Sequence, residues 1–178
     1  MEPTYVYLAG IDNSGPQHWQ YRWHAAQTNA VWVEHASWDA PVRDLWVADL
    51  DAALRSIDGP KLIVAHSLGC SLLTEWAADH ADSAITGAFL VAAPDPHGPH
   101  FPTAAQGFGT PRLAPLPFPT VLVASADDPY SSPAHARTTA TALAADLVEA
   151  GALGHLNPAS GLGDWPTGRA LLAQRLYR

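Results

Sequence analysis

The 178 residues suffice to bury one hydrophobic core and are few for two, so we expect a single domain over residues 1–178. A formal net charge of -8, from 9 basic and 17 acidic residues, argues against a nucleic acid or an anionic membrane as a partner. Cys70 is the sole cysteine, which excludes a disulfide framework, and the sequence shows neither a secretory signal nor an apolar run of bilayer-spanning length. We therefore expect a cytoplasmic protein, whose oligomeric state the sequence leaves open.

The first predicted elements are a buried strand over Tyr5–Ala9 and an aromatic helix around His18, Trp19 and Trp23. A polar turn over residues 10–16, which contains Gly, Asn and Pro, joins them. Because this turn follows a strand of the predicted sheet, we expect it to form one wall of a site.

Two further elements precede the central motif. Residues 31–35 (VWVEH) predict a second strand, and residues 42–57 predict an amphipathic helix that ends at Asp58 and Gly59. The apolar stripe of this helix includes Trp46, so we expect that side chain in the core.

The chain is organised around Lys61–Cys70, which reads KLIVAHSLGC. Its apolar run predicts a strand buried on both faces, and residues 70–78 predict a helix. Ser67 stands in the turn between them, and the flanking Ala65 and Gly69 are small enough for strand and helix to approach each other. The pattern predicts a nucleophile elbow with Ser67 as nucleophile. The alternative is that Ser67 only caps a helix behind a buried strand.

Strands and helices alternate through the rest of the chain. Pro133 begins a predicted helix over residues 134–145. Apolar runs predict strands over residues 86–92 and 121–125, and a further strand is expected over residues 146–149. Such alternation is typical of an α/β fold with a parallel sheet covered on both faces. Residues 93–119, rich in Pro, Gly and His, are long for a simple connection, so we expect a functional rim or short lid and no separate cap domain.

Candidate partners of Ser67 follow the last two predicted strands. One strand runs straight into Asp127 and Asp128, and His155 lies in a Gly-flanked loop after the other. The chain order Ser, Asp, His is that of the α/β-hydrolase triad. We prefer Asp128 to Asp127 as the acid, because Pro129 stiffens the backbone after it. Asp127 would then be a turn or capping carboxylate, which hydrogen-bonds nearby backbone N–H groups.

These three side chain types together indicate acyl chemistry. His155 would take the Ser67 proton as general base and return it to the leaving group. Asp128 would hold the imidazole in the required tautomer and stabilise the imidazolium.

Two backbone N–H groups are expected to form an oxyanion hole. Leu68 would provide the first, at the positive end of the helix that follows Ser67. Hydrolases built on such sheets take the second from a loop after an early strand. Here we expect that donor to be the N–H of Ile11 or of Asp12, and the sequence does not choose between them.

The motifs resemble a known family. Four motifs carry the resemblance: the early loop with Ser14, Gly15, Pro16, His18 and Trp19, the elbow AHSLGC, the segment SADDPYSSP, and the GHLN around His155. Through them, the sequence resembles the small single-domain serine hydrolases related to retinoblastoma-binding protein 9 and the bacterial YdeN-like proteins. The resemblance spreads over nearly the whole chain. It departs from the family at Ala65 in the elbow, where Gly is usual, and in the proline-rich residues 94–119.

The resemblance implies a compact α/β-hydrolase, a three-layer sandwich with about six mostly parallel strands. It places the triad on Ser67, Asp128 and His155. Family members are serine hydrolases with esterase-like or peptidase-like activity suggested for some.

We therefore expect a serine hydrolase that cleaves carboxyl esters, or related acyl bonds, of small-molecule substrates through a Ser67 acyl-enzyme. Carboxylesterase-like activity is favoured, peptidase-like or thioesterase activity shares the same chemistry, and no cofactor is needed. The alternative from another class is a protein-interaction module on a hydrolase scaffold, because a fold does not fix a function.

Other polar and aromatic side chains receive narrower expectations. His18 and Trp19, near the early loop, are candidate substrate-binding residues, with core packing as the alternative for Trp19. No metal is expected, because His97 and His100 have no third ligand at a recognisable spacing. His66, beside Ser67, is expected to pack and hydrogen-bond next to the elbow, and Cys70, past the elbow, is expected to be buried in the core.

Overall fold

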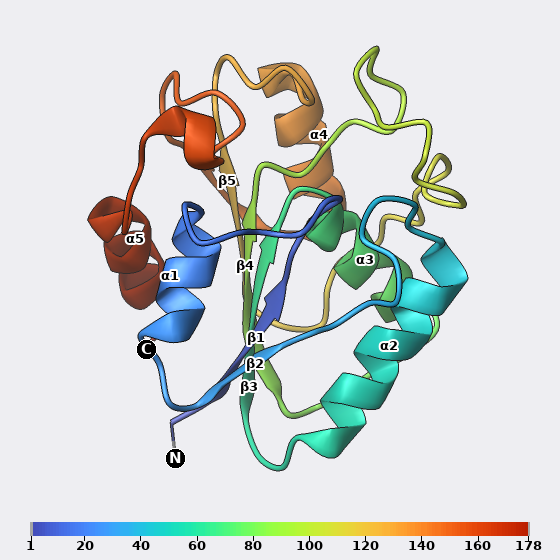
Figure 1. Cartoon of the computed structure of the whole chain (residues 1–178), viewed down its shortest axis with the longest axis vertical. Coiled ribbons are helices and arrows are strands. Elements are labelled where there is room, and N and C mark those ends of the chain that lie inside the picture. The colour runs from blue at the N-terminus through green and yellow to red at the C-terminus, as the bar shows by residue number, and fades with distance from the viewer. Residues whose placement is uncertain (1, 178) are drawn as a thin grey trace.

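The computed structural model describes residues 2–177 and places one six-stranded parallel sheet between two layers of helices (Figure 1). The strands are β1 (Thr4–Leu8), β2 (Ala30–Trp32), β3 (Lys61–His66), β4 (Ile85–Val91), β5 (Thr120–Ala124) and β6 (Asp146–Glu149). The helices are α1 (Trp19–Ala25), α2 (Arg43–Ser56), α3 (Leu68–Ala77), α4 (Pro133–Leu143) and α5 (Pro166–Leu176), with a short 3₁₀ turn, η1 (Pro158–Ser160). None of these helices is long and apolar enough to cross a membrane.

The strands follow the order β2-β1-β3-β4-β5-β6, and all neighbours run parallel. Successive side chains of β3 enter opposite cores, because a strand alternates its side chains between two faces. Leu62 and Val64 contribute to one core, and Ile63 and Ala65 to the other. Helices α2, α3 and α4 cover the face that carries Ile63 and Ala65, and α1 and α5 cover the face that carries Leu62 and Val64 (Figure 1). The three-layer α/β architecture is as the sequence predicts, and within residues 2–177 no cap domain interrupts it.

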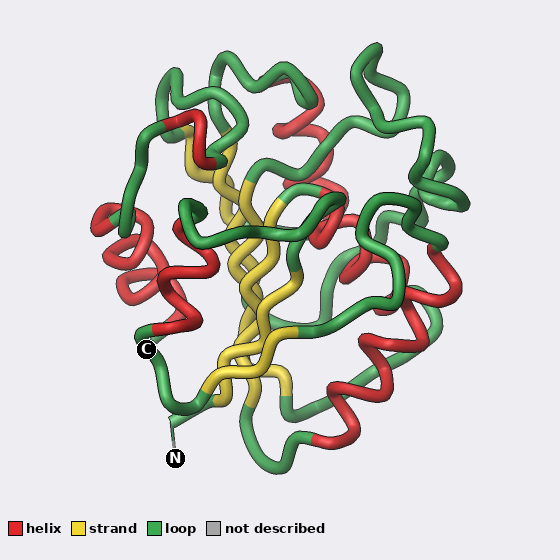
Figure 2. The backbone as a smooth tube through the Cα atoms, in the orientation of Figure 1, coloured by secondary structure: helices red, strands yellow, loops and turns green. Residues whose placement is uncertain are grey.

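The parallel direction of the strands sets the position of the candidate site. Ser67 follows β3, Asp128 lies beyond β5, and His155 lies beyond β6. Figure 2 shows the longest loops at the end of the sheet where these strands finish. In open α/β sheets this carboxyl edge is where ligands bind.

The second strand is shorter than the predicted residues 31–35 and ends at Trp32. Its last expected residue, His35, turns into the core instead. Its Nδ1 lies 2.7 Å from Asp49 of α2, and its ring stacks on Trp46 with centroids 4.0 Å apart. The main chain still bonds to β1 at Val33, whose N–H donates to the Tyr7 carbonyl at 3.1 Å. The contact of His35 with α2 depends on residues distant in sequence, which an apolar pattern does not reveal.

Helix α5 is absent from the sequence-based expectations, because its sequence has little apolar periodicity. Its position depends on aromatic packing against α1. Trp165, just before the helix, meets Trp19 edge-on with ring centroids 5.0 Å apart and stacks on Trp23 at 5.8 Å. Gly168 allows this, because a Cβ there would lie 2.2 Å from the Trp165 ring.

Residues 93–119, the rim segment, contain no helix or strand in the structure. The segment is held by buried Phe108 and by Arg112, whose Nε lies 3.0 Å from a carboxylate oxygen of Glu75 on α3. The Arg112 N–H also donates to the other oxygen of Glu75. The buried carboxylate therefore fixes this irregular segment to the helix that follows Ser67.

Candidate active site

Ser67 has backbone angles of φ 52° and ψ −124°, a strained conformation for a residue with a side chain. Its N–H donates to the Val91 carbonyl at 2.9 Å, which ties the turn to β4. Gly69 lies so close to β1 that a Cβ on it would be 2.3 Å from the Leu8 carbonyl oxygen. The side chain of Ala65, on the strand side of the turn, is fully buried. The strand, turn and helix thus have the geometry of a nucleophile elbow, and α3 begins at Leu68, two residues before the predicted start.

Three side chains form a continuous hydrogen-bonded row. Ser67 Oγ lies 2.9 Å from Nε2 of His155, and Nδ1 of His155 lies 2.9 and 3.0 Å from the two carboxylate oxygens of Asp128. A carboxylate can only accept, so Nδ1 carries the proton and Nε2 presents a lone pair to the Ser67 hydroxyl. Asp128 is almost fully buried, which strengthens its effect on the imidazole.

Asp127 has different partners from its neighbour. Its carboxylate accepts hydrogen bonds from the Gly154 N–H and the Ser125 hydroxyl, each at 2.8 Å. These bonds, that of Gly154 first, lower the pKa of Asp127. The structure therefore brings Asp128, and not Asp127, to the imidazole of His155, while Asp127 serves the turn.

The early loop lies directly against the elbow. A Cβ on Gly10 would be 3.3 Å from the Leu68 nitrogen, so the two expected oxyanion donors stand on neighbouring segments. The Asp12 N–H already donates to the Trp38 carbonyl at 2.8 Å. Of the two candidate donors of the early loop, this favours the Ile11 N–H over that of Asp12.

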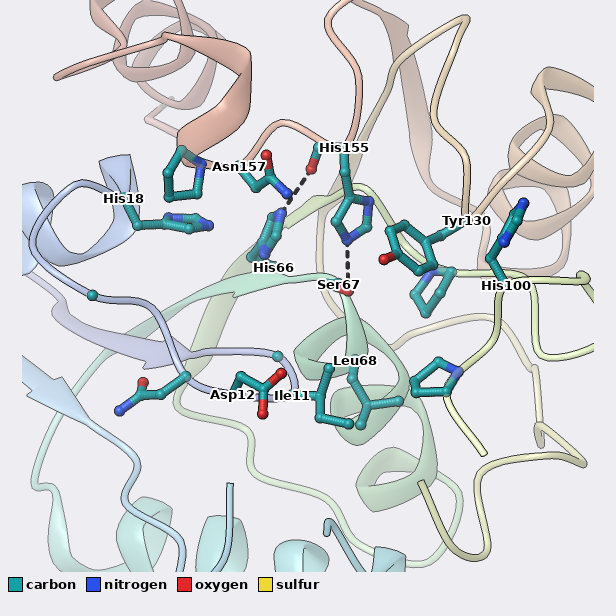
Figure 3. A pocket seen from close by; sticks show the side chains of 16 residues that line it. Ile11, Asp12, His18, His66, Ser67, Leu68, His100, Tyr130, His155 and Asn157 are labelled. Atoms are coloured by element: carbon teal, nitrogen blue, oxygen red, sulfur yellow. Dashed lines mark hydrogen bonds between the residues drawn. The ribbon is translucent and has the colours of Figure 1, made fainter. Parts of the chain in front are cut away.

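A cavity of about 370 Å³ opens above Ser67 (Figure 3). Among the described residues that line it, Asp12 is the sole side chain with a formal charge when the histidines are neutral. The lining comprises Gly10, Ile11, Asp12, Asn13, Gly15, His18, His66, Ser67, Leu68, Pro94, His100, Pro102, Tyr130, His155, Asn157 and Pro158. The cavity has the dimensions of a site for a small molecule.

The two candidate substrate-binding residues lie in different places. His18 lines the cavity, caps α1 by accepting the Gln20 N–H, and has its pKa lowered to about 4, chiefly by burial. Trp19 is outside the lining: it is 1% exposed, and its indole donates to the Leu156 carbonyl at 2.8 Å. The expectation that Trp19 binds substrate is therefore corrected, because helix α1 turns its ring into the core.

Sequence reasoning did not identify two of the cavity walls. Tyr130 lies with its ring centroid 4.4 Å from that of His155, and Asn157 faces it across the imidazole (Figure 3). Both residues directly follow the segments that carry the triad, so proximity in sequence was a usable signal. His100 of the rim segment also lines the cavity.

The structure offers no evident metal site within residues 2–177. No group of three His, Cys, Asp or Glu side chains there is placed to hold an ion. His97 and His100 remain a pair without a third ligand. Cys70 is buried, and burial raises the pKa of its thiol to about 12, which suits packing rather than nucleophilic chemistry.

The parallel sheet, the strained serine turn and the Ser–His–Asp row define an α/β-hydrolase with a site of the serine-hydrolase type. The chain belongs to the Serine hydrolase family, whose model matches residues 5–174.

Several solved structures are similar to this chain. A YdeN-like hydrolase from Pectobacterium atrosepticum is 27% identical with a TM-score of 0.85, and the match covers 99% of this chain and 91% of that one. The ydeN gene product from B. subtilis is 19% identical with a TM-score of 0.82, over 99% and 100% of the two chains. The type II thioesterase BorB from the borrelidin biosynthetic cluster shares the fold at 16% identity and a TM-score of 0.72, over 99% and 93%. Among curated proteins, none matches this chain in sequence.

Proposed function

We propose that this serine hydrolase cleaves carboxyl esters or related acyl bonds of small substrates through a covalent acyl-enzyme on Ser67. The observation that carries the proposal is the hydrogen-bonded row in which Ser67 Oγ lies 2.9 Å from Nε2 of His155 and Nδ1 of His155 reaches Asp128. The proposal needs no cofactor.

The first half of the reaction forms the acyl-enzyme. His155 takes the proton of Ser67 through Nε2 while Oγ bonds to the acyl carbon. The N–H groups of Leu68 and Ile11 donate to the oxygen that becomes negative in the tetrahedral intermediate. The imidazolium, stabilised by Asp128, then gives its proton to the leaving group as the acyl–oxygen bond breaks.

The second half regenerates the enzyme. His155 takes a proton from a water molecule, whose oxygen attacks the acyl carbon, and the proton passes to Ser67 Oγ as the acyl bond breaks. Thioesters and amides follow the same steps with another leaving group. The cavity of about 370 Å³ supports small substrates, and a carboxylesterase-like specificity is the one we propose.

A fluorophosphonate probe tests the proposal. It should label the wild type at Ser67 and should label neither Ser67→Ala nor His155→Ala, since labelling needs an activated hydroxyl. A panel of activated esters, thioesters and amides on the same three proteins then identifies the bond type. A folded wild type that is not labelled would overturn the proposal and favour an interaction module on a hydrolase scaffold. A cytoplasmic location stays a prediction of the sequence.

A further inference from the structure

The loop that carries His155, residues 151–157, has little regular structure of its own to hold it. Gly154 and Leu156, on either side of His155, both have left-handed backbone angles, with φ of 58° and 50°. The Leu156 N–H makes a long bond of 3.3 Å within the loop. The position of the imidazole therefore depends on contacts from other elements.

Two of these contacts come from the residues that directly precede the other triad members. His66, before Ser67, has its Nε2 3.0 Å from the carbonyl oxygen of His155 (Figure 3). Asp127, before Asp128, accepts the N–H of Gly154 at 2.8 Å. The loop is thus bonded on the carbonyl side by the strand that carries the nucleophile and on the amide side by the turn that carries the acid.

The chemical state of His66 suits this contact. A carbonyl oxygen can only accept, so Nε2 of His66 must carry the proton. The side chain is buried, and desolvation lowers its pKa well below the usual range, which keeps the ring neutral. Its neighbouring rings are those of His18, His155 and Trp19, with centroids 4.6, 5.0 and 6.1 Å away. His66 is therefore a neutral donor with a fixed tautomer.

We propose that His66 and Asp127 are positioning residues, which hold the backbone of the His155 loop so that Nε2 faces Ser67 Oγ. This inference rests on the proposed serine-hydrolase function. Each residue bonds the main chain of the loop, and the His66 ring also packs against the imidazole of His155, with centroids 5.0 Å apart. Because a misplacement of about 1 Å in a catalytic group can cost about a hundredfold in rate, the loss of either anchor should lower kcat with little change in KM.

A matched pair of substitutions at His66 separates the hydrogen bond from packing. Glutamine carries an amide N–H at about the reach of Nε2, whereas leucine fills the space without a donor. With 4-nitrophenyl acetate, His66→Leu should lower kcat by about tenfold or more, with KM changed less than about twofold. His66→Gln should recover most of that loss. Asp127→Ala should lower kcat in the same way, and Asp127→Asn, which keeps an acceptor oxygen, should lower it less.

A buried histidine that does not line the cavity, His35, provides the control. His35→Leu removes a similar side chain beneath α2, where it stacks on Trp46, and should lower the melting temperature without lowering kcat. Equal kcat values for His66→Leu and His66→Gln, or an equal loss in His35→Leu, would overturn the proposal.

Two further readouts separate this inference from the proposed function. If fluorophosphonate labels Ser67 in both His66 variants as fast as it labels Ser67 in the wild type, the positioning role fails while the hydrolase proposal stands. Long-range proton–nitrogen NMR of the wild type needs no turnover and no variant. It should show neutral His66 with the proton on Nε2 at pH 7, and a proton on Nδ1 or a charged ring would refute the anchor.

Discussion

The elbow over Lys61–Cys70 and the rim segment over residues 93–119 both border the cavity, but different contacts hold them. The elbow is fixed by main-chain geometry: β3 pairs with a strand on each side, and Gly69 lies against the backbone of β1. The rim segment pairs with no strand: its main chain bonds to other segments at separate points, as Gln106 does with Pro41 and Arg43, and Arg112 binds the carboxylate of Glu75. Substitutions in the elbow should therefore remove the chemistry, and those in the rim segment should alter substrate binding.

The strongest test compares two histidines that line the cavity. His155→Ala, like Ser67→Ala, should lower kcat for an activated ester by about ten-thousandfold, because each removes a member of the triad. His100→Ala, in the rim segment, should keep kcat within about tenfold. Steady-state ester hydrolysis measures both. A loss in His100→Ala as large as that in His155→Ala would end the distinction between the two regions.

The next test concerns the two adjacent acids. Asp128→Asn should lower kcat by about a thousandfold or more, because it can no longer hold the imidazole tautomer. Asp127→Asn should lose less than about tenfold, since it keeps an acceptor for the loop. Parallel pH–rate profiles on both variants provide the measurement. Equal losses would contradict the assignment of Asp128 as the triad acid.

The next test compares a glycine of the elbow that lies against another backbone segment with a glycine of the rim segment that has free space around it. Gly69→Ala should destabilise the protein by about 2–4 kcal/mol, because its Cβ would lie 2.3 Å from the Leu8 carbonyl oxygen. Gly109→Ala, in the rim segment, has no atom within 4 Å of its Cβ and should change stability by less than about 1 kcal/mol. Urea unfolding of the two variants gives both values. A tolerated Gly69→Ala would show that the elbow relaxes easily.

The pH dependence of stability tests the buried histidine of the early loop. Burial, and to a smaller extent His155, lower the pKa of His18 from 6.5 to about 4. Between about pH 4 and pH 6.5, His18 therefore binds a proton in the unfolded chain but not in the native state. The free energy of unfolding should therefore fall as the pH drops from 6.5 toward 4, by up to about 3 kcal/mol. His18→Asn, which retains a capping acceptor, should flatten this slope. An unchanged slope would contradict the burial effect.

The smallest effect is expected at the anchor of the rim segment. Arg112→Gln removes the charged contacts with Glu75 and Asp79 and should loosen the segment near Pro94, His100 and Pro102, which line the cavity. KM for short esters should rise several-fold while kcat changes less than about twofold. A fall in kcat with constant KM would mean that the rim segment shapes the catalytic geometry as well.

The parts of the fold that the sequence predicted well have strong local signals. The apolar runs of β3 and β4 and the small residues around Ser67 directly reflect burial on two faces and close approach of strand and helix. The fold class and the serine-hydrolase family are confirmed, and the roles of Ser67, Asp128 and His155 stay predictions that the geometry supports.

The sequence-based predictions are least accurate where a partner distant in the chain determines the position of a residue. The ring of Trp19 packs on Trp165, 146 positions along the chain, so the structure shows its alternative role, core packing. Strand β2 ends before His35, whose side chain pairs with α2. The sequence suggested a hydrogen-bonding role for His66, but its partner, the carbonyl of His155, lies 89 positions away and could not be read from a local pattern.

By itself, the sequence determined the alternation of strands and helices, the turn at Ser67 and the order of the three candidate triad members, because these follow from local hydrophobicity and steric limits. The tertiary structure alone decided which acid meets His155, which of the two early N–H groups is bonded elsewhere, and which aromatic rings line the cavity. Each of these depends on competition among hydrogen-bond partners and packing surfaces that meet only after the sheet has formed.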